Sequence, residues 1–333
     1  MLRPLTKVLV IRFSSIGDIV LTSAVVRCLR QQLRGAEIHF LTKSQFEPLL
    51  RGNPHITKIW EYDHNFDDLI PQLKSQGFTF VVDLHKNYRS VFAVTQLGVR
   101  AASFPKLNFR KWLMVRFRIN LLPDVHIVDR YFRACVKLGV RYDGMGLDYF
   151  IPPADEVDPA TLPVSHRGGY VAVVIGGKHT TKIFPADKVS EVCRELSHPV
   201  ILLGGKEDRG RGELIAGMTG PGVYNGCGLY NLNQSASLVR QALAVMTNDT
   251  GLMHVAAAFR KPIVSVWGNT IPGFGMFPFM TEETQSLSFI AEVNGLSCRP
   301  CSKLGFRECP KKHFKCMNNI NPAPIVSFLN HHP

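Results

Sequence analysis

The sequence predicts an α/β fold with two Rossmann-like, doubly wound parallel-sheet domains that face a central cleft. Short apolar runs alternate with segments of helical periodicity, once on each side of a patternless segment at 151–169 that is rich in Pro, Gly, Asp and Ser. Strands separated by helices pair in parallel, with helices on both faces of the sheet. The length of 333 residues also exceeds what one hydrophobic core usually supports.

The first half contains the runs that predict the first sheet. Continuous apolar stretches predict buried strands, and apolar residues at helical spacing predict a helix. The expected strands are 8–11, 37–41 and 80–84, and the expected helix is 19–33. We expect these elements to form an N-terminal domain at 1–155, followed by a linker at 156–169.

The second half repeats the same alternation, and its helices begin with residues suited to a first turn, such as Pro185. The expected strands are 170–175, 200–203, 244–247 and 262–267, and the expected helices are 185–196, 235–243 and 252–259. We expect a C-terminal domain at 170–333 that ends in a cysteine-rich tail.

Composition is that of an ordinary globular protein, with 45% apolar and 20% charged residues. No segment has the roughly 18 uninterrupted apolar residues of a membrane span, and the first apolar run is too short for a signal sequence. We therefore expect a cytoplasmic protein.

The net charge of +13 indicates an acidic partner, either nucleic acid, anionic lipid or a phosphorylated substrate. From His85 to Arg118 there is no Asp or Glu but a cluster of eight cations. They are Lys86, Arg89, Arg100, Lys106, Arg110, Lys111, Arg116 and Arg118. A solvated basic face explains single charges of this kind, whereas the cluster favours a surface that faces an anion.

A turn rich in small residues follows the first expected strand. It reads Arg12-Phe13-Ser14-Ser15-Ile16-Gly17-Asp18 and leads into a helix. Such a turn brings backbone N–H groups and one carboxylate to the edge of the sheet. Asp18 alternatively does no more than complement the helix N-terminus. The Gly-x-Gly-x-x-Gly signature of dinucleotide binding is absent from the chain.

Three further loops follow strands of the second half. The loop at 176–185 has two glycines, two threonines and two lysines, a combination that suits a diphosphate, although its lysines are alternatively solvated surface residues. The loop at 204–208 places a carboxylate where dinucleotide folds bind ribose, and is equally compatible with a plain surface turn. The segment Asn248-Asp249-Thr250-Gly251 precedes a helix, where it either caps the helix or holds an anionic leaving group.

No Asp-x-Asp pair is present to hold a divalent metal with a diphosphate, so a mechanism without metal is expected. The tail offers a separate candidate metal site in Cys298, Cys301, Cys309 and Cys316. A Cys-x-x-Cys pair followed by two more cysteines suits structural zinc, and reduced thiols in an irregular loop explain it as well. The other four cysteines lie in apolar surroundings and are expected to be free thiols.

Taken in order along nearly the whole chain, these motifs resemble glycosyltransferase family 9, the bacterial heptosyltransferases of the lipopolysaccharide inner core. The matching residues are Ser14 to Asp18; Val82-Asp83-Leu84 with Lys86, Arg89 and Ser90; His126, Asp129 and Arg130; Lys182 and Pro185; Gly204, Gly205, Glu207 and Asp208; and Asn248 to Gly251 with His254 and Pro262. The resemblance implies the GT-B fold and an inverting transfer of a heptose from ADP-heptose to a Kdo- or heptose-bearing lipid A core. It also implies that no cofactor is required.

The resemblance assigns roles to individual residues. Asp18 and Lys182 would be catalytic, Asp18 as the general base and Lys182 at the departing diphosphate. Donor-binding residues would be Ser15, Gly17, Thr180, Thr181, Asp208, Asp249, Thr250, Gly251 and His254. Acceptor-binding residues would be Lys86, Arg89, Arg100 and Arg110. The second domain would bind the nucleotide-sugar, and the basic first domain the phosphorylated acceptor, with peripheral contact to the anionic inner leaflet.

One departure from the family concerns the loop before Lys182. It reads Lys178-His179-Thr180-Thr181, whereas better-known members carry acidic residues there. The donor sugar is therefore open, and the alternatives are a GT-B transferase or an epimerase that uses another nucleotide-sugar. A basic nucleic-acid-binding protein with a zinc tail is a further alternative, which the apolar runs inside the basic stretch disfavour.

Overall fold

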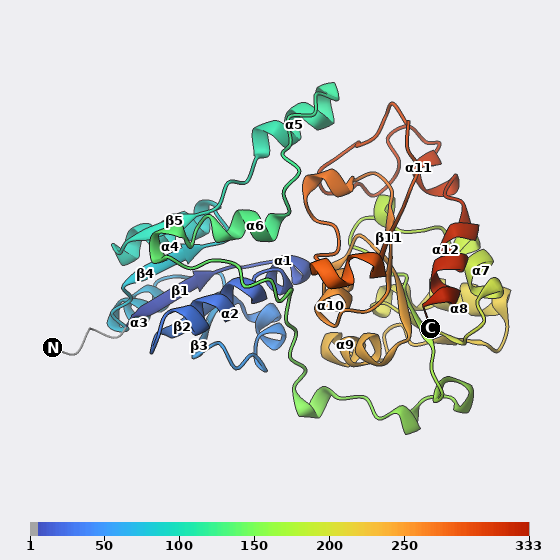
Figure 1. Cartoon of the computed structure of the whole chain (residues 1–333), viewed down its shortest axis with the longest axis horizontal. Coiled ribbons are helices and arrows are strands. Elements are labelled where there is room, and N and C mark those ends of the chain that lie inside the picture. The colour runs from blue at the N-terminus through green and yellow to red at the C-terminus, as the bar shows by residue number, and fades with distance from the viewer. Residues whose placement is uncertain (1–5, 333) are drawn as a thin grey trace. The chain divides into compact units, whose positions relative to one another are not determined.

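The computed structural model describes residues 6–332, which form two compact units (Figure 1). Unit 1 takes in the described residues up to 106 together with 125–152. Unit 2 takes in 107–124 and the described residues from 153 onward. Each unit contains one all-parallel sheet, so the predicted α/β class with two doubly wound sheets is confirmed.

The sheet of unit 1 has five parallel strands in the order β3-β2-β1-β4-β5. They are β1 (Lys7–Ile11), β2 (Glu37–Lys43), β3 (Lys58–Tyr62), β4 (Phe80–Asp83) and β5 (Ala101–Ser103). The strand order reverses between β1 and β4, where Ile11 pairs with Asp83. Ligands of open α/β sheets bind at the carboxyl ends of the strands that flank such a reversal.

Helices cover both faces of this sheet. They are α1 (Ile16–Val20), α2 (Ser23–Gln32), α3 (Leu69–Ser75), α4 (Tyr88–Leu97) and α6 (Ile127–Phe132). Leu9 and Ile11 of β1 point to the face where α3 and α4 add Leu73 and Ala93 to the core. Alternate residues such as Val10 point to the opposite face and are fully buried as well, on the side of α2.

The single helix expected at 19–33 is instead divided between α1 and α2. The hydroxyl of Thr22 donates to the carbonyl of Ile19 (2.6 Å), and the Thr22 backbone N–H bonds to the same oxygen (2.9 Å). A continuous helix would use that carbonyl for the N–H four residues on, so competition from threonine ends the first helix. Asp18 therefore lies on a short helix of its own.

The sheet of unit 2 has six parallel strands in the order β11-β10-β9-β6-β7-β8. They are β6 (Val171–Val174), β7 (Val200–Leu203), β8 (Val223–Asn225), β9 (Ala244–Asn248), β10 (Ile263–Trp267) and β11 (Ser288–Glu292). The order reverses between β9 and β6, and this reversal is the second point at which ligand binding is expected.

Six helices surround this sheet: α7 (Ala186–Glu195), α8 (Arg209–Thr219), α9 (Leu232–Gln241), α10 (Gly251–Ala258), α11 (Lys315–Asn318) and α12 (Pro322–His331). One face of the sheet packs Val173 and Met246 against Val192 of α7, Ile215 of α8 and Leu329 of α12. On the other side α9 contacts α10.

Residues 107–124 belong to unit 2, although they lie between two unit-1 segments in the sequence. They contain α5 (Asn108–Phe117), which no pattern in the sequence predicted. The guanidinium of Arg118, the residue after α5, donates to the carbonyls of Ser297 (3.0 Å) and Cys298 (2.9 Å). The helix is thereby tied to the tail of unit 2.

The segment 153–169 consists of short 3-10 turns held against α9. Asp155 accepts hydrogen bonds from the side-chain amides of Asn231 and Asn233 (2.8 and 2.9 Å). Glu156 accepts hydrogen bonds from the Ser237 hydroxyl and the Arg240 guanidinium (2.8 and 2.7 Å). Because of these bonds, residues 153–169 belong to unit 2.

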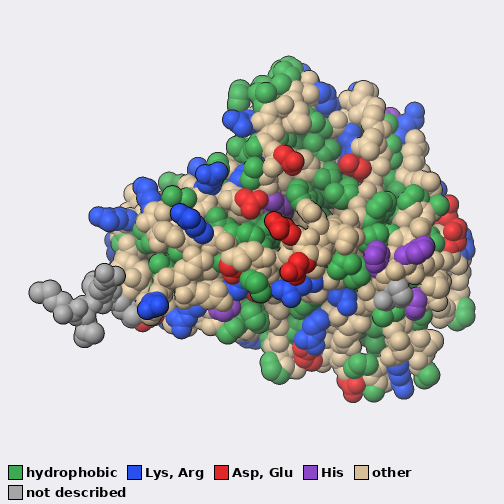
Figure 2. Space-filling view, in the orientation of Figure 1, with side chains coloured by type: hydrophobic (Ala, Val, Ile, Leu, Met, Phe, Trp, Pro, Cys, Tyr) green, Lys and Arg blue, Asp and Glu red, His purple; other side chains and the backbone are tan. Residues whose placement is uncertain are grey.

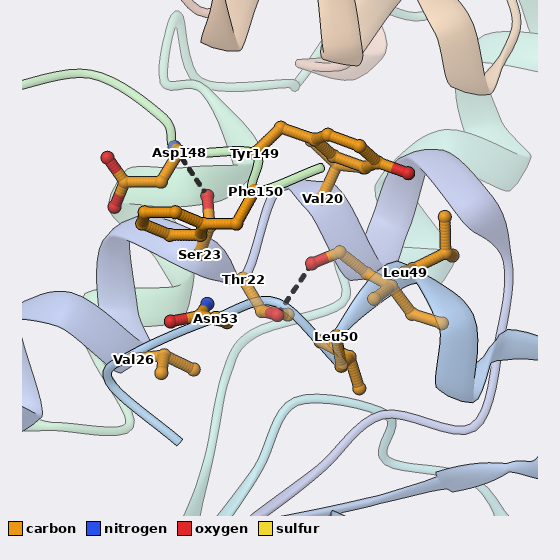
Figure 3. Close-up of a pocket in the computed structure, with 11 residues that line it drawn as sticks. Val20, Thr22, Ser23, Val26, Leu49, Leu50, Asn53, Asp148, Tyr149 and Phe150 are labelled. Carbon is orange, nitrogen blue, oxygen red and sulfur yellow. Dashed lines mark hydrogen bonds between the residues drawn. The ribbon is translucent and has the colours of Figure 1, made fainter. Parts of the chain in front are cut away.

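No helix among residues 6–332 is both long and apolar enough to cross a membrane. A small hollow in unit 1 lies beside α1 and α2 and is lined by Val20, Leu49 and Tyr149, among others (Figure 3). Its volume of about 10 Å³ suffices for about one water molecule. Since a sugar cannot fit there, the hollow is not a substrate site.

Candidate active site

Asp18 lies in the turn after β1, next to the reversal of strand order in unit 1. Its carboxylate accepts hydrogen bonds from the backbone N–H of Ser15 (3.2 Å) and from the Ser15 hydroxyl (2.8 Å). These bonds form part of a capping box at the start of α1, with Gly17 buried between the two residues. The carboxylate is thus held in one place while part of its surface remains exposed.

Arg12, the residue after β1, fixes this carboxylate from inside the protein. Its guanidinium pairs with Asp18 at 2.6 Å and donates to the carbonyls of Ser14 (2.7 Å) and Leu84. Burial alone would lower the pKa of Arg12, but the carboxylates of Asp18 and Asp83 and the Tyr131 hydroxyl together outweigh it and raise that pKa overall. The Arg12 guanidinium is thus engaged within unit 1 by Asp18 and two backbone carbonyls.

Asp83 shapes the neighbouring loop, which follows β4. Its buried carboxylate accepts hydrogen bonds from the backbone N–H groups of His85 (2.9 Å) and Lys86 (2.8 Å) and from the Ser90 hydroxyl (2.8 Å). Both carboxylate oxygens of Asp83 therefore accept hydrogen bonds from the loop, so Asp83 positions its neighbours rather than reacting.

His85 is a neutral imidazole next to the Asp18–Arg12 pair. Its ring packs edge-on against Phe13, with 5.3 Å between centroids, and its Nδ1 finds no hydrogen-bond partner among the described residues. Burial, together with the positive charges of Arg12 and Lys106, lowers the pKa of His85 to about 3. The ring therefore adds no positive charge to this site at neutral pH.

The four cations expected to bind the acceptor belong to both units. Lys86, Arg89 and Arg100 lie in unit 1, whereas Arg110 lies on α5 and belongs to unit 2. The guanidinium of Arg89 lies over the exposed ring of Tyr88, 4.8 Å from its centroid. The eight predicted cations thus do not form one surface of the N-terminal unit.

Lys182 and Asp249 meet at the reversal of strand order in unit 2. Their side chains pair at 2.5 Å and are 17% and 11% exposed. The hydroxyl of Thr270, which follows β10, donates to the same carboxylate oxygen at 2.9 Å. The pair therefore connects the loops after β6, β9 and β10, and part of the Lys182 side chain still reaches solvent.

Asn248 joins the same two loops through the backbone. Its side-chain carbonyl accepts from the N–H of Phe184 (3.0 Å), and its amide donates to the carbonyl of Gly176 (3.1 Å). The loop at 176–185 is thereby fixed against the end of β9. Asn248 is buried and serves the architecture of the site.

The helix α10 begins at Gly251, directly after Asp249 and Thr250. Thr250 is in an extended conformation and makes no side-chain capping bond within the described residues, and its hydroxyl lies 3.3 Å from that of Thr247. The Thr250 side chain therefore does not cap α10, whose N-terminus has the orientation of helix ends that bind anions. His254 is buried on the same helix and lies within the packing of unit 2.

Thr180 and Thr181, expected to contact the diphosphate, differ in environment. Thr180 is exposed, whereas Thr181 is buried. The Thr181 hydroxyl accepts from the backbone N–H of Phe306 (2.8 Å), and the Thr181 N–H donates to the Phe306 carbonyl (3.2 Å). Thr181 thus fastens the loop to the tail, which leaves Thr180 as the accessible hydroxyl.

Asp208 is buried after β7, with both carboxylate oxygens in use. One accepts from the N–H of Gly205 (3.0 Å), and the other pairs with Arg211 (3.1 Å). A Cβ on Gly176 would lie 2.4 Å from this carboxylate, so that glycine makes room for Asp208. Glu207, one residue earlier, is exposed instead.

The cysteine-rich tail braces the loops of unit 2. Arg299 donates to the carbonyls of Gly268 (2.6 Å) and Thr270 (2.9 Å) and pairs with Glu292 (2.6 Å). The tail thus holds the residue whose hydroxyl binds Asp249. No group of three or more His, Cys, Asp or Glu between residues 6 and 332 is arranged to hold a metal ion, so the zinc prediction for Cys298, Cys301, Cys309 and Cys316 gains no support.

The predicted residues therefore form one group in each unit. Asp18 with Ser15 and Gly17 forms the first, and Lys182 with Asp249, Thr250 and Gly251 forms the second. Sequence reasoning missed the supporting roles of Arg12, His85, Thr270 and Arg299. Only Arg12 had a signal, since a cation directly after a buried apolar strand must find a partner.

The model of glycosyltransferase family 9 (heptosyltransferase) matches residues 67–302 of the chain. Lipooligosaccharide heptosyltransferase 2 of Haemophilus ducreyi is 24% identical over 97% of this chain and 98% of its own length. The E. coli ADP-heptose lps heptosyltransferase II structure superposes with a TM-score of 0.73 at 18% identity, covering 98% of each chain. A glycosyltransferase family 9 structure from Veillonella parvula gives a TM-score of 0.77 at 18% identity, again over 98% of each chain.

These structural likenesses establish the fold as that of the GT-B heptosyltransferases. The family match covers more than half of the chain and includes Lys182, Asp208 and Asp249. The chain belongs to glycosyltransferase family 9, the heptosyltransferase family, and is a glycosyltransferase.

Proposed function

We propose that the protein transfers a heptose from ADP-heptose to the Kdo- or heptose-bearing inner core of lipopolysaccharide, with inversion at the anomeric carbon. The observation that carries the proposal is the pair of charged groups at the two strand-order reversals. Unit 1 offers a partly exposed carboxylate, Asp18, and unit 2 offers a partly exposed lysine side chain, Lys182. A base and a diphosphate-binding cation are the two groups that an inverting transfer requires.

The donor is proposed to bind unit 2. Lys182 and the N–H groups at the start of α10, which Thr250 does not cap, are suited to the diphosphate, since cations and helix N-termini both favour phosphate oxygens. Thr180 is the accessible hydroxyl of the same loop. Carboxylates of the 204–208 loop would meet the ribose, Glu207 by direct contact and Asp208 by holding the loop.

The acceptor is proposed to bind unit 1, where Lys86, Arg89 and Arg100 supply positive charge for its phosphates and carboxylates, joined by Arg110 from α5. Such an acceptor is borne on a lipid, so the reaction would take place on the cytoplasmic surface of a membrane. Anionic lipids attract a protein of net charge +13 to that surface.

In the proposed reaction Asp18 removes the proton of the attacking acceptor hydroxyl. The hydroxyl oxygen forms a bond to the anomeric carbon as the bond from that carbon to the diphosphate oxygen breaks. ADP departs with the electron pair, and Lys182 and the N–H groups of α10 stabilise its charge. These groups supply the charge neutralisation, so the proposed mechanism includes no metal ion.

A different nucleotide-sugar donor is the second candidate, and the loop before Lys182 favours it. That loop carries Lys178 and His179 where better-known members have acidic residues. Because this loop would lie next to the donor, a change in its charge is expected to change the donor preference. An epimerase is distinguished by turnover of the donor without an acceptor.

The test measures release of nucleoside diphosphate from ADP-heptose with and without a truncated lipid A–Kdo acceptor. We compare the wild type with Asp18→Asn, which keeps the size of the side chain, and add ADP-, UDP- and GDP-hexoses as alternative donors. Removal of the general base should lower the rate by about 10²–10⁴-fold. Circular dichroism and urea unfolding establish that the variant is folded.

Acceptor-dependent release that falls in the variant supports both the transferase and its base. Release without acceptor would replace the proposal by an epimerase or hydrolase. Release only from another nucleotide-sugar would correct the donor. An undiminished rate in Asp18→Asn would refute Asp18 as the base.

A further inference from the structure

Helix α5 carries a cluster of exposed aromatic side chains. Phe109, Trp112 and Phe117 are 69%, 49% and 55% exposed. The rings of Phe109 and Trp112 stack at 5.9 Å, and Trp112 meets Phe117 edge-on at 5.4 Å, so the three form one surface. We call these three residues the α5 patch. Figure 2 shows the hydrophobic side chains gathered over this helix, with Lys and Arg beside them.

The helix is poorly covered by the rest of the protein. None of its residues is buried, and its ten residues fall short of the length at which a helix is stable alone in water. Ile119 and Leu121, which follow it, are about half exposed too. Its ties to unit 2 are the Arg118 hydrogen bonds to the tail and the ammonium of Lys111, 5.5 Å from the ring centroid of Phe274.

The charge around the α5 patch has one sign. Arg110, Lys111, Arg116 and Arg118 lie on or next to the helix, and the sequence has no Asp or Glu from residue 85 to residue 123. The guanidinium of Arg116 lies 5.9 Å from the ring centroid of Phe117. Apolar rings on a stretch of chain that carries cations and no acidic residue complement a surface that is apolar inside and anionic outside.

We propose that the α5 patch is a membrane anchor, whose aromatic rings enter the boundary between headgroups and acyl chains of an anionic bilayer. Arg116, whose guanidinium lies beside the Phe117 ring, would bind the lipid phosphates above the rings. The proposed function gives the reason for a membrane anchor, because a lipid-borne acceptor must be reached at a membrane. The α5 patch and the cations beside it identify where on the protein the anchor lies.

An anionic lipid surface fits these observations better than a protein partner does. Aromatic residues flanked by Lys and Arg are typical of helices that lie in the membrane interface. A second copy of this chain would bring the same cations face to face, since its α5 patch is surrounded by the same charges. Charge complementarity therefore favours an anionic lipid surface over a second copy of this chain.

Intrinsic fluorescence reports directly on the α5 patch. Of the three tryptophans, Trp60 and Trp267 are buried, which leaves Trp112 as the exposed one. The full-length protein is titrated with vesicles of phosphatidylcholine alone and of an equimolar mixture with phosphatidylglycerol. We expect a blue shift with the anionic vesicles, and its loss in Trp112→Phe, which keeps an aromatic ring but removes the reporter.

Vesicle co-sedimentation then measures the contribution of the patch. The test variant is Phe109→Gln/Trp112→Gln/Phe117→Gln, because glutamine preserves helix propensity. The matched control is Leu214→Gln/Leu229→Gln, which removes two equally exposed apolar side chains elsewhere in unit 2. We expect affinity for anionic vesicles to fall by about tenfold or more in the test variant and to stay unchanged in the control.

Three results would overturn the proposal: wild-type protein that binds neither vesicle, binding that survives in the test variant, or a dimer without lipid that the test variant abolishes. A water-soluble acceptor without acyl chains separates this proposal from the transferase proposal. The test variant should release ADP with that acceptor at the wild-type rate. Absence of release by the wild type would count against the transferase and leave the vesicle result standing.

Discussion

The two units each hold a carboxylate and a cation at the reversal of strand order, but they use the pair in opposite ways. In unit 1 the cation is Arg12, which is buried and donates to two carbonyls besides Asp18. In unit 2 the cation is Lys182, whose only hydrogen-bond acceptors within the described residues belong to Asp249. Arginine stays charged and keeps a fixed fork of donors, whereas lysine is a mobile point charge.

Under the proposed function, this difference predicts which partner of each pair would meet the substrate. The Arg12 guanidinium cannot leave its carbonyls without breaking the turn after β1, so Asp18 is the available group. Asp249 is held by Thr270 and belongs to the loop before α10, so Lys182 is the group that can turn to a phosphate. Asp249 would then keep Lys182 in place until the donor binds.

Breaking the pair of unit 1 should have the largest effect on stability. Arg12→Met leaves Asp18 without its cation and the carbonyls of Ser14 and Leu84 without a donor. We expect unfolding free energy to fall by about 3 kcal/mol or more, measured by urea titration. If Arg12→Met unfolds at the same urea concentration as the wild type, the pair is not structural, and the comparison between the units fails.

Breaking the pair of unit 2 should affect catalysis more than stability. Lys182→Met is expected to lower the rate of nucleoside diphosphate release by about 10²–10³-fold, since one charge at the leaving group is lost. Its cost in unfolding free energy should be about 2 kcal/mol, less than for Arg12→Met, because the Lys182 side chain is 17% exposed and, among the described residues, donates only to Asp249. Lys182→Arg is the matched variant, and a rate equal to that of Lys182→Met would show that geometry matters as well as charge.

A smaller effect is expected where Asp249 is held in place. Thr270→Val keeps the shape of the side chain but removes the hydroxyl that donates to Asp249. We expect the KM for the donor to rise by about tenfold, the equivalent of one hydrogen bond to a charged group. Thr219→Val, which removes a hydroxyl bonded to the Ile215 carbonyl on α8, is the control and should leave KM unchanged. Equal KM values in both variants would remove Thr270 from the site.

The parts of the fold that the sequence predicts are those with strong burial on both faces. Val8 to Ile11 and Val200 to Leu203 are continuous apolar runs because helices cover both sides of their sheets. β5 and β8 have three half-buried residues each and give no run to detect. α5 gives no helical periodicity because it has no buried face.

The candidate site likewise has one part that the sequence could predict and one part that it could not. Asp18, Lys182 and Asp249 lie in loops that follow strands, so their placement at the carboxyl edge of their own sheet could be inferred from the alternation of strands and helices. Thr270 and Asp249 are 21 residues apart, and Arg299 reaches Thr270 over 29 residues. Contacts of this kind depend on which loops meet in three dimensions, and no local spacing indicates them.

The smallest expected effect sharpens the description of unit 1 and concerns pH. Burial and the charges of Arg12 and Lys106 lower the pKa of His85 to about 3, against about 6.5 in an unfolded chain. Between these values the unfolded state binds a proton that the folded state does not, so His85 should destabilise the protein as pH falls from about 6.5 toward 3. His85→Gln should make unfolding free energy less dependent on pH in that range.

Buried His39 and His166, whose pKa values are also lowered by burial, will keep some dependence of the unfolding free energy on pH. His331→Gln changes an exposed histidine and serves as the control. If both variants keep the wild-type slope of unfolding free energy against pH, His85 is not held neutral beside Arg12. Arg12 would then be less buried than the comparison between the two units assumes.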